Sequence, residues 1–426
     1  MTRAVSSIYT SFLDAPPAAC VSVPFHPSDG SDPQAPGGVE INSTPSAGNS
    51  SGGGRDQGDG GSAARARSLL VTGTYTLDKE TSLRHGSLIL HEAALEGKQD
   101  GTNEQIEVKL VQTVPLPSGS VLDIRLLKLS ATRSFPDGSK LAVATSTGQV
   151  SVYSISSESA PSLQLVSNHI VTDDTTLILS LAISPDGLLL AATTSQSAIV
   201  ILKFTDNTFT SLQPVAEISD AHTSLEAWTS VFSTDGTILY SGGDDASFAA
   251  WDVGSIETTS DEDQVVQQVY RNRKVHTAGV TSILPVTISG MEYIFTGSYD
   301  QHIRVYSPST KRWLDGEVDL DGGVWRLERL TDHQYFRLQD HTEKSSDENI
   351  ETVWILASCM HAGCCVLKTE FIIGEDRVVV TPVATMKEHE SMNYASACVW
   401  HGSDGRKEPT FISTSFYDQR FCCWKL

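Results

Sequence analysis

One pattern occurs twice between His222 and Tyr306, and this repeat constrains the fold more than any other feature of the chain. Each copy begins with a histidine and continues through an apolar strand, a second strand ending in small residues, an aspartate turn and a strand ending in an aromatic residue. The step from His222 to His276 is 54 residues, and the step from Gly243 to Gly297 is also 54. Two equal offsets indicate a structural repeat.

This order of elements resembles the WD-repeat propeller, in which each repeat forms a four-stranded blade. In that arrangement the turn aspartates accept hydrogen bonds from the turn backbone and from the histidine of the repeat. We expect this structural role for Asp245, Asp300 and Asp418. Hairpin signals of the type Pro-Asp-Gly or Thr-Asp-Gly recur at corresponding places in successive units, at Asp137, Asp186 and Asp235.

The spacing of these signals predicts an all-β chain, a seven-bladed propeller that occupies residues 1–426 as a single domain. We expect the first strand-like piece, near Ser7, to become the outer strand of the last blade, which closes the ring and covers an exposed sheet edge. The sixth blade is expected to begin near Trp313. Ser28 to Arg67 is rich in glycine and serine and is predicted to be a disordered insertion in the first blade. A polar loop insertion is predicted at residues 338–349.

The charge and the cysteine content limit the function classes. The chain has 30 Lys and Arg residues against 52 Asp and Glu residues, a formal net charge of −22, without a basic run that could follow a phosphate backbone. Nucleic acid is therefore not an expected partner. Seven cysteines in no metal-binding or disulfide spacing predict reduced, buried thiols. Without a signal sequence or a long apolar run, no membrane contact is expected and a cytoplasmic location is predicted. A closed ring has no obligatory need for a partner, so a monomer is predicted.

Several motifs of the second half occur together in one order. They are Gly242-Gly243-Asp244-Asp245, Thr296 to Asp300, Gly322-Gly323-Val324-Trp325-Arg326-Leu327, Cys359 to Gly363 and Ser415-Phe416-Tyr417-Asp418. Together they resemble the WD-repeat proteins of diphthamide biosynthesis that act as diphthine methyl ester hydrolases. The first two motifs occur in many propellers, whereas the last three in register are much more specific.

The resemblance implies a methyl ester hydrolase that acts on translation elongation factor 2. Its reaction would convert the over-methylated intermediate into diphthine and methanol, so that the free carboxylate can be amidated in the final step. Other enzymes of the pathway would be further partners. No cofactor is implied.

No hydrolase motif is recognisable in the residues themselves. There is no GxSxG elbow and no HExxH or other paired-histidine spacing, so no metal is expected. His222, His276 and His389 occupy the structural histidine position of the repeat. His361 stands where the repeat has its turn aspartate, so it is the candidate catalytic base, although it could simply replace the aspartate. Cys364 and Cys365 lie in an apolar strand and are poor candidate nucleophiles.

Aromatic residues near the turns are candidates for substrate binding. Intermediates of the pathway carry a trimethylammonium group, and aromatic faces attract such cations. Trp325, Tyr299 and Tyr417 are therefore the predicted substrate-binding residues, with Asp244 adding electrostatic attraction. Alternatively, Trp325 packs between blades.

A non-catalytic WD-repeat scaffold for protein assembly or trafficking is the second hypothesis, because propellers often serve as platforms. The two hypotheses differ at His361 and Trp325. An esterase should lose turnover when these residues are replaced, whereas a scaffold should tolerate their replacement unless they touch its partner.

Overall fold

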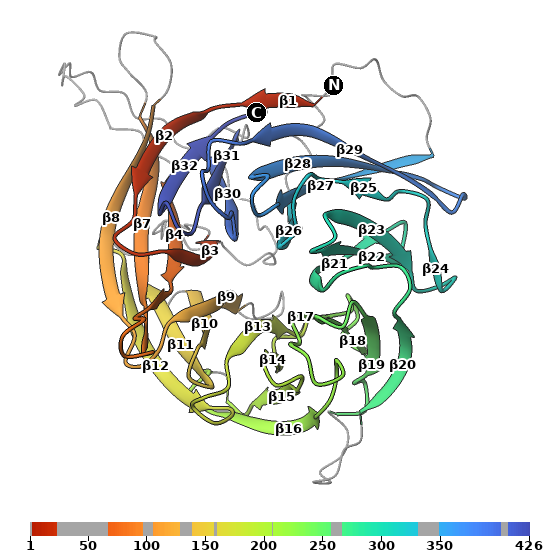
Figure 1. The fold of residues 1–426 in the computed structure, drawn as a ribbon, viewed down its shortest axis with the longest axis horizontal. Coiled ribbons are helices and arrows are strands. Elements are labelled where there is room, and N and C mark those ends of the chain that lie inside the picture. Colours follow the sequence, from red (N-terminus) through yellow and green to blue (C-terminus); the bar gives the residue numbers. More distant parts are fainter. Residues whose placement is uncertain are drawn as a thin grey trace, which may run out of the picture.

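The computed structural model describes residues 2–23, 67–96, 105–127, 139–156, 160–206, 208–256, 266–330, 349–401 and 408–426. Within these ranges all regular structure is β, and seven sheets of four or five strands are arranged around a central axis (Figure 1). This confirms the predicted seven-bladed propeller. The predicted insertions at 28–67 and 338–349 lie outside the described residues, except for Arg67 and Asn349, as does the turn at Asp137.

The first three blades follow one another along the chain, each with its innermost strand first. Blade one contains β3 (Pro17–Val23), β4 (Arg67–Thr74), β7 (Ser87–Glu96) and β8 (Gln105–Pro115), with a small outlying sheet of β5 (Thr76–Leu77) and β6 (Arg84–His85). Blade two contains β9 (Val121–Leu127), β10 (Ser139–Thr145), β11 (Gln149–Ser156) and β12 (Ser162–Ile170). Blade three contains β13 (Ile178–Ile183), β14 (Leu189–Thr194), β15 (Ile199–Phe204) and β16 (Leu212–Ile218).

Blades four and five correspond to the two sequence repeats. Blade four contains β17 (Thr229–Phe232), β18 (Ile238–Gly242), β19 (Phe248–Asp252) and β20 (Gln267–Asn272). Blade five contains β21 (Val280–Ile288), β22 (Met291–Ser298) and β23 (His302–Ser307), and its outer strand is divided into β24 (Arg312–Trp313) and β25 (Val318–Asp319). The prediction that blade six begins near Trp313 is therefore wrong, because Trp313 pairs with Tyr306 at the outer edge of blade five.

The last two blades receive strands from the beginning of the chain. Blade six contains β26 (Arg326–Leu330), β27 (Ile350–Ser358), β28 (Cys364–Ile372) and β29 (Arg377–Met386). Blade seven contains β30 (Ala395–His401), β31 (Glu408–Thr414) and β32 (Arg420–Trp424). β2 (Ser7–Phe12) pairs antiparallel with β32, and β1 (Arg3–Val5) pairs parallel with β29. The predicted closure by the N-terminal strand is confirmed, and both ends of the chain lie side by side in Figure 1.

Small residues at the ends of the second strands allow neighbouring blades to approach closely. A Cβ atom added at Gly242 would lie 2.6 Å from Val280 Cγ1, and one added at Gly297 would lie 2.5 Å from Val324 Cγ1. Each valine belongs to the next blade along the chain, and both valines are fully buried. The glycines of the sequence repeat therefore determine the spacing between blades, and the apolar core lies between the blades.

One face of the ring carries both the segments that lead into the innermost strands and the turns between the second and third strands. Because the strands of each blade alternate in direction, every innermost strand starts on the face that also holds the turn between the second and third strands. We call this the start face. The turns at Asp244, Tyr299, His361 and Tyr417 all lie on it, so the predicted site residues share one side of the molecule.

Candidate functional site

The repeat histidines have the structural role that the sequence predicts. His222 is fully buried, and its Nδ1 lies 2.8 Å from Asp245 Oδ1 while its Nε2 lies 2.9 Å from Ser241 Oγ. Trp251 Nε1 donates to the same Ser241 Oγ at 2.8 Å, which links the turn to the third strand of the blade. Burial lowers the pKa of His222 even though Asp245 favours its protonation. His222 therefore stabilises blade four and is not available for chemistry.

The other two repeat histidines are also hydrogen-bonded within their blades, although Nδ1 of His389 is buried without a described partner. His276 is hydrogen-bonded to Thr296 and receives a hydrogen bond from Arg304, which also pairs with Asp300 at 2.9 Å. His389 Nε2 lies 2.9 Å from Ser413 Oγ, and Asp418 of the same blade accepts a hydrogen bond from Glu390 N. Burial lowers the pKa of both histidines to about 4. The expected role is confirmed in part: Asp300 accepts hydrogen bonds from Thr277 N and His302 N, and Asp418 accepts one from Glu390 N. Among the described residues, neither aspartate accepts a hydrogen bond from the histidine of its repeat, as Asp245 does.

A cluster of aromatic side chains lies on the start face. The ring of Trp325 contacts three others, with centroid distances of 5.6 Å to Trp228, 5.8 Å to Tyr299 and 5.0 Å to Tyr394. Trp228 and Tyr299 also contact each other at 5.9 Å. All four side chains are partly exposed. We call these four residues the aromatic cluster.

The cluster continues toward the first blade. Phe416 lies 5.6 Å from Tyr394 and in turn contacts Tyr417 at 5.0 Å and Tyr75 at 6.1 Å. Tyr417 is 73% exposed and marks the outer rim. The row of rings therefore crosses the start face from blade four to blade one.

Acidic groups accompany one end of the aromatic cluster. Trp228 Nε1 donates to Asp244 Oδ1 at 3.0 Å, and Asp244 N donates to Glu226 O. A Cβ atom added at Gly279 would lie 2.8 Å from Asp244 Oδ1 and 3.1 Å from Tyr299 Cδ2, so Asp244 and Tyr299 flank the same backbone. Burial, with Tyr394, Asp244 and Glu226 nearby, raises the pKa of Tyr299. Aromatic faces beside carboxylates form an environment that favours a cation.

A charged pair joins two blades across the ring, and one of its members directly follows Trp325 in the chain. Arg326, the first residue of β26 in blade six, places Nη1 2.8 Å from Oδ1 of Asp123 on β9 in blade two. Asp123 is fully buried, and its Oδ2 accepts hydrogen bonds from Arg125 Nε at 3.0 Å and from Leu181 N at 2.9 Å. Burial opposes ionisation of Asp123, but Arg125 and Arg326 hold its pKa below the usual value. Two blades that are not neighbours are thereby connected.

His361 lies at the tip of the β27–β28 turn, and its side chain is exposed. It is the third of five residues between Ser358 and Cys364, as Asp300 is between Gly297 and Ile303, so its predicted place in the repeat is confirmed. Among the described residues no hydrogen bond, ion pair or ring contact involves its side chain. His361 therefore does not take over the buried structural role of the turn aspartate.

The turn that carries His361 nevertheless adjoins the aromatic cluster through the backbone. Trp325 N donates to Ser358 O at 2.8 Å, and Asn393 N donates to Met360 O at 3.0 Å. Asn393 directly precedes Tyr394, so the turn lies between the segments that carry Trp325 and Tyr394. A Cβ atom added at Gly323 would lie 2.5 Å from Met360 Sδ and 3.4 Å from a ring carbon of Tyr299.

The cysteines do not form a second reactive site. All seven are free and buried. Burial raises the pKa of the Cys365 thiol to about 11 and also raises the pKa of Cys364, so neither is a ready nucleophile. Among the described residues, no group of three or more histidine, cysteine or acidic side chains could hold a metal ion. No described helix is long and apolar enough to cross a membrane.

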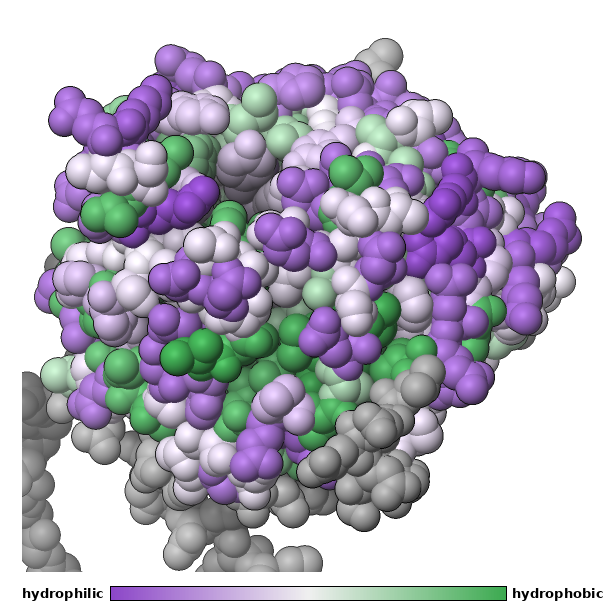
Figure 2. Space-filling model, turned by 60° about the horizontal axis from the view of Figure 1, so that its bottom comes forward, coloured by the Kyte–Doolittle hydropathy of each residue, from purple (hydrophilic) through white to green (hydrophobic). Residues whose placement is uncertain are grey.

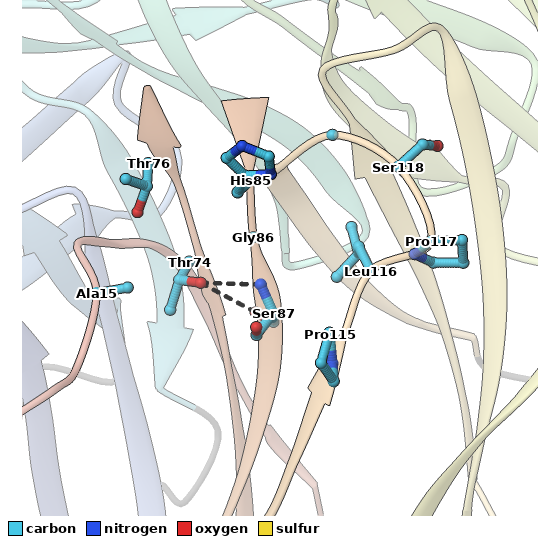
Figure 3. Close-up of a pocket in the computed structure, with 11 residues that line it drawn as sticks. Ala15, Thr74, Thr76, His85, Gly86, Ser87, Pro115, Leu116, Pro117 and Ser118 are labelled. Atoms are coloured by element: carbon cyan, nitrogen blue, oxygen red, sulfur yellow. Dashed lines mark hydrogen bonds between the residues drawn. The ribbon is translucent and has the colours of Figure 1, made fainter. Parts of the chain in front are cut away.

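A cavity of about 280 Å³ lies on the start face beside the far end of the row of rings (Figure 3). Thr74, Thr76 and His85 of blade one line one side, and Pro115 to Gly119 line the other. Thr74 Oγ1 accepts a hydrogen bond from Ser87 N at 2.9 Å within this wall. Tyr75, between two of the lining residues, contacts Phe416. The cavity and the aromatic cluster are thus connected through Tyr75 and Phe416.

The structure brings most of the predicted substrate-binding residues together. Trp325 and Tyr299 are in contact, and Asp244 reaches them through Trp228, whereas Tyr417 lies at the rim. Trp325 contacts rings that belong to three other blades and remains partly exposed. Trp228, Tyr394 and Phe416 were not predicted as site residues from the sequence. A shared position could have revealed two of them, because Trp228, Trp325 and Tyr394 each directly precede an innermost strand.

Comparisons with known proteins identify the class of protein to which this fold belongs. The sequence model of the WD domain, G-beta repeat family matches residues 267–307, which lie in blade five and the strand before it. Among solved structures, a chain of the Mitotic Checkpoint Complex superposes with a TM-score of 0.52 at 15% identity, covering 84% of each chain. Sqt1 of Chaetomium thermophilum, solved with the N-terminus of ribosomal protein L10, has a TM-score of 0.52 at 12% identity over 84% of this chain and 93% of Sqt1. The protein is a WD-repeat β-propeller.

Sequence relatives define the family more closely. Diphthine methyltransferase of Schizosaccharomyces pombe is 31% identical over 84% of this chain and 90% of its own length. The protein of the same name from Saccharomyces cerevisiae is 24% identical over 84% of this chain and 92% of its length. The chain belongs to the diphthine methyltransferase family.

Proposed function

We propose that this chain hydrolyses the methyl ester of methylated diphthine on translation elongation factor 2, producing diphthine and methanol and leaving the carboxylate free for the final amidation. Family membership supports a role in diphthamide biosynthesis. The observation that carries the proposal is the aromatic cluster beside Asp244 and Glu226, because the substrate carries a permanent trimethylammonium cation.

The binding step follows from the geometry of the aromatic cluster. Each aromatic face contributes about 0.5–2 kcal/mol to the binding of a cation, more where water is excluded. Trp228, Tyr299, Trp325 and Tyr394 offer several faces within one group of contacts. The net charge of −22 adds long-range attraction for a cationic group. The four rings are partly exposed, which suits a substrate that is a side chain of another protein.

The chemical step requires a base and water. Water adds to the ester carbonyl carbon, the bond from that carbon to the methoxy oxygen breaks, and the methoxy group leaves as methanol after it receives a proton. His361 is the proposed base, since it is exposed in the turn between the Trp325 and Tyr394 segments. A positioned base contributes about 10² to 10⁴-fold to such a rate.

The relatives bear a name that denotes methyl transfer, and the two reactions differ in the fate of the methyl group. Hydrolysis releases the methyl group as methanol and needs no methyl donor. Methyl transfer to the factor would consume a methyl donor, and methyl transfer from the factor would methylate another molecule. The test is incubation of the purified chain with factor carrying the esterified intermediate, with methanol and the mass of the factor both measured. Catalytic methanol release without an added donor supports the proposal. Binding of the factor without release indicates a scaffold and contradicts it.

A further inference from the structure

Arg326 occupies a distinctive place relative to the aromatic cluster. It directly follows Trp325 and is the first residue of the innermost strand of blade six, so it lies at the start-face end of the ring's inner wall. Asp123 lies two residues inside β9, about 7 Å from the beginning of that strand at a strand rise of about 3.3 Å per residue. The ion pair is therefore near the same opening as the aromatic rings.

Asp123 holds this arginine in a fixed position. Its Oδ1 accepts a hydrogen bond from Ile124 N and pairs with Arg326 Nη1 at 2.8 Å. Its Oδ2 accepts from Arg125 Nε, Leu181 N and Ser180 Oγ at 2.9 to 3.2 Å. A carboxylate held by this many donors cannot easily move, and it restricts the guanidinium bound to it.

The arginine itself retains unused capacity. Its side chain is 20% exposed, and Nη1 is its one paired nitrogen among the described residues. Its Nε is buried without a described hydrogen-bond partner, which is costly for a residue with a purely structural role. With Nη1 paired and Nε buried, Nη2 is the guanidinium nitrogen left to meet a ligand. A charged guanidinium donor binds carboxylate oxygens strongly.

Three other cations of the described residues have acidic partners. Lys387 pairs with Asp321, and Arg420 pairs with Glu390, both on the surface. Arg125 uses its Nε for Asp123, and Glu328 lies close enough to influence it. Within the described group of Asp123, Glu328, Arg125 and Arg326, the positive and negative charges balance. Arg326 is the member that adjoins the aromatic cluster in sequence.

We propose that Arg326, braced by Asp123 across the ring, binds the carboxyl group of the ligand whose quaternary ammonium group lies on the aromatic cluster. The site is then specific for a zwitterion, a trimethylammonium carboxylate. This inference rests on the proposed function, and it identifies the free acid product as a ligand that the site retains. In the ester, the same guanidinium faces the carbonyl oxygen on which negative charge develops.

Small probes separate the two halves of the site. Binding of tetramethylammonium and of 4-trimethylammoniobutyrate is measured by titration calorimetry with the full chain. The zwitterion is expected to bind about ten- to a hundred-fold more tightly, the usual contribution of a charged hydrogen bond. In Arg326→Gln this preference should disappear while tetramethylammonium affinity stays the same. In the control Lys387→Gln, which removes a surface cation paired with Asp321, the preference should remain.

Three outcomes overturn the proposal. They are equal affinity of the unmodified chain for the two probes, absence of binding by either probe at millimolar concentration, and an unchanged preference in Arg326→Gln. If Arg326→Gln does not fold, as judged by thermal unfolding, Arg326→Lys decides. This variant keeps the charge but loses the planar fork, so the preference should fall to a few-fold, and an unchanged preference contradicts the proposal.

The binding test does not depend on turnover, so the two proposals can fail separately. An Arg326-dependent preference without methanol release would contradict the hydrolase alone. If methanol is released but the preference for the zwitterion over tetramethylammonium is unchanged in Arg326→Gln, the carboxylate site alone is contradicted.

Discussion

Arg326 Nη1 lies 2.8 Å from Asp123 Oδ1 across the ring, and this pair joins blade six to blade two. Innermost strands otherwise contact the innermost strands of neighbouring blades, such as β9 with β3 and β13. The ion pair therefore connects two blades that are not neighbours. It also orients the Arg326 guanidinium near the aromatic cluster. Substitutions on either side of the pair should separate these two roles.

Replacement of Asp123 by Asn should destabilise the ring. The substitution leaves Arg125 and Arg326 without their anion, and breaking a buried pair in this way costs about 3 kcal/mol, with the partial exposure of both arginines favouring the lower part of the range. Urea unfolding measures the change. Asp321→Asn is the control, because its pair with Lys387 is exposed and should contribute less than about 1 kcal/mol. Equal effects of the two substitutions would contradict the account.

The same carboxylate predicts a pH dependence at the acid end. Because the folded pKa of Asp123 is held below its unfolded value of about 3.9, its stabilising contribution is present above that pH. The contribution is lost as the pH falls through the folded pKa. Below pH 4, the loss of unfolding free energy should therefore be smaller in Asp123→Asn than in the unmodified chain.

Buried histidines predict a second pH effect, at higher pH. Burial lowers the pKa of His91, His276 and His389 to about 4, whereas the unfolded value is about 6.5. The unfolded chain takes up protons first as the pH falls, so stability is full above pH 6.5 and declines toward pH 4, by up to about 3 kcal/mol for each residue. Denaturant unfolding at pH 7 and pH 5 measures this decline. Equal free energies of unfolding at pH 7 and pH 5 would show that these histidines protonate in the folded chain as readily as in the unfolded chain.

Replacement of Trp325 by Ala should weaken substrate binding. The loss of a cation-binding face worth about 0.5–2 kcal/mol should raise KM by about two- to thirty-fold, with little change in kcat. Steady-state kinetics on esterified factor measure both constants. Trp325→Phe is the matched variant, since it retains a ring face and should keep most of the affinity. An unchanged KM in Trp325→Ala, with normal thermal unfolding, is incompatible with cation binding at the cluster.

Replacement of His361 by Ala should affect turnover. If the ring activates water, kcat should fall by about 10² to 10⁴-fold while KM stays nearly constant. His169→Gln serves as the control, because His169 lies on the outer strand of blade two, in a different blade from the residues of the aromatic cluster. Stability should not change in either variant, as the His361 side chain is exposed. A kcat within two-fold of the unmodified chain would remove His361 from the mechanism.

The repeat explains why the fold was predictable and the site only partly so. His222, Asp245 and Gly242 interact within a blade or with the next one, so their spacing is visible along the chain. Trp325, Tyr299 and Asp244 were found because they lie in the turns of that repeat. Asp123 and Arg326 meet only when the ring closes, and no local pattern records contacts between blades two and six.

The surface also carries information that the sequence pattern does not. Figure 2 shows a face on which hydrophilic residues predominate and hydrophobic residues gather in a continuous band. Alternation along single strands predicts which residues are buried within a blade, but it does not predict where hydrophobic residues gather on the surface. The boundary of blade six was misplaced for a related reason, since Trp313 belongs to a fourth strand that is divided in two.

The central claim is that the start face hydrolyses an ester at its acyl carbon. The most direct test is turnover of esterified elongation factor 2 in water enriched in the heavy oxygen isotope, with no methyl donor added. The account predicts one heavy oxygen in the carboxylate of the product and none in the released methanol. Heavy oxygen in the methanol, or turnover that requires a methyl donor, would contradict it.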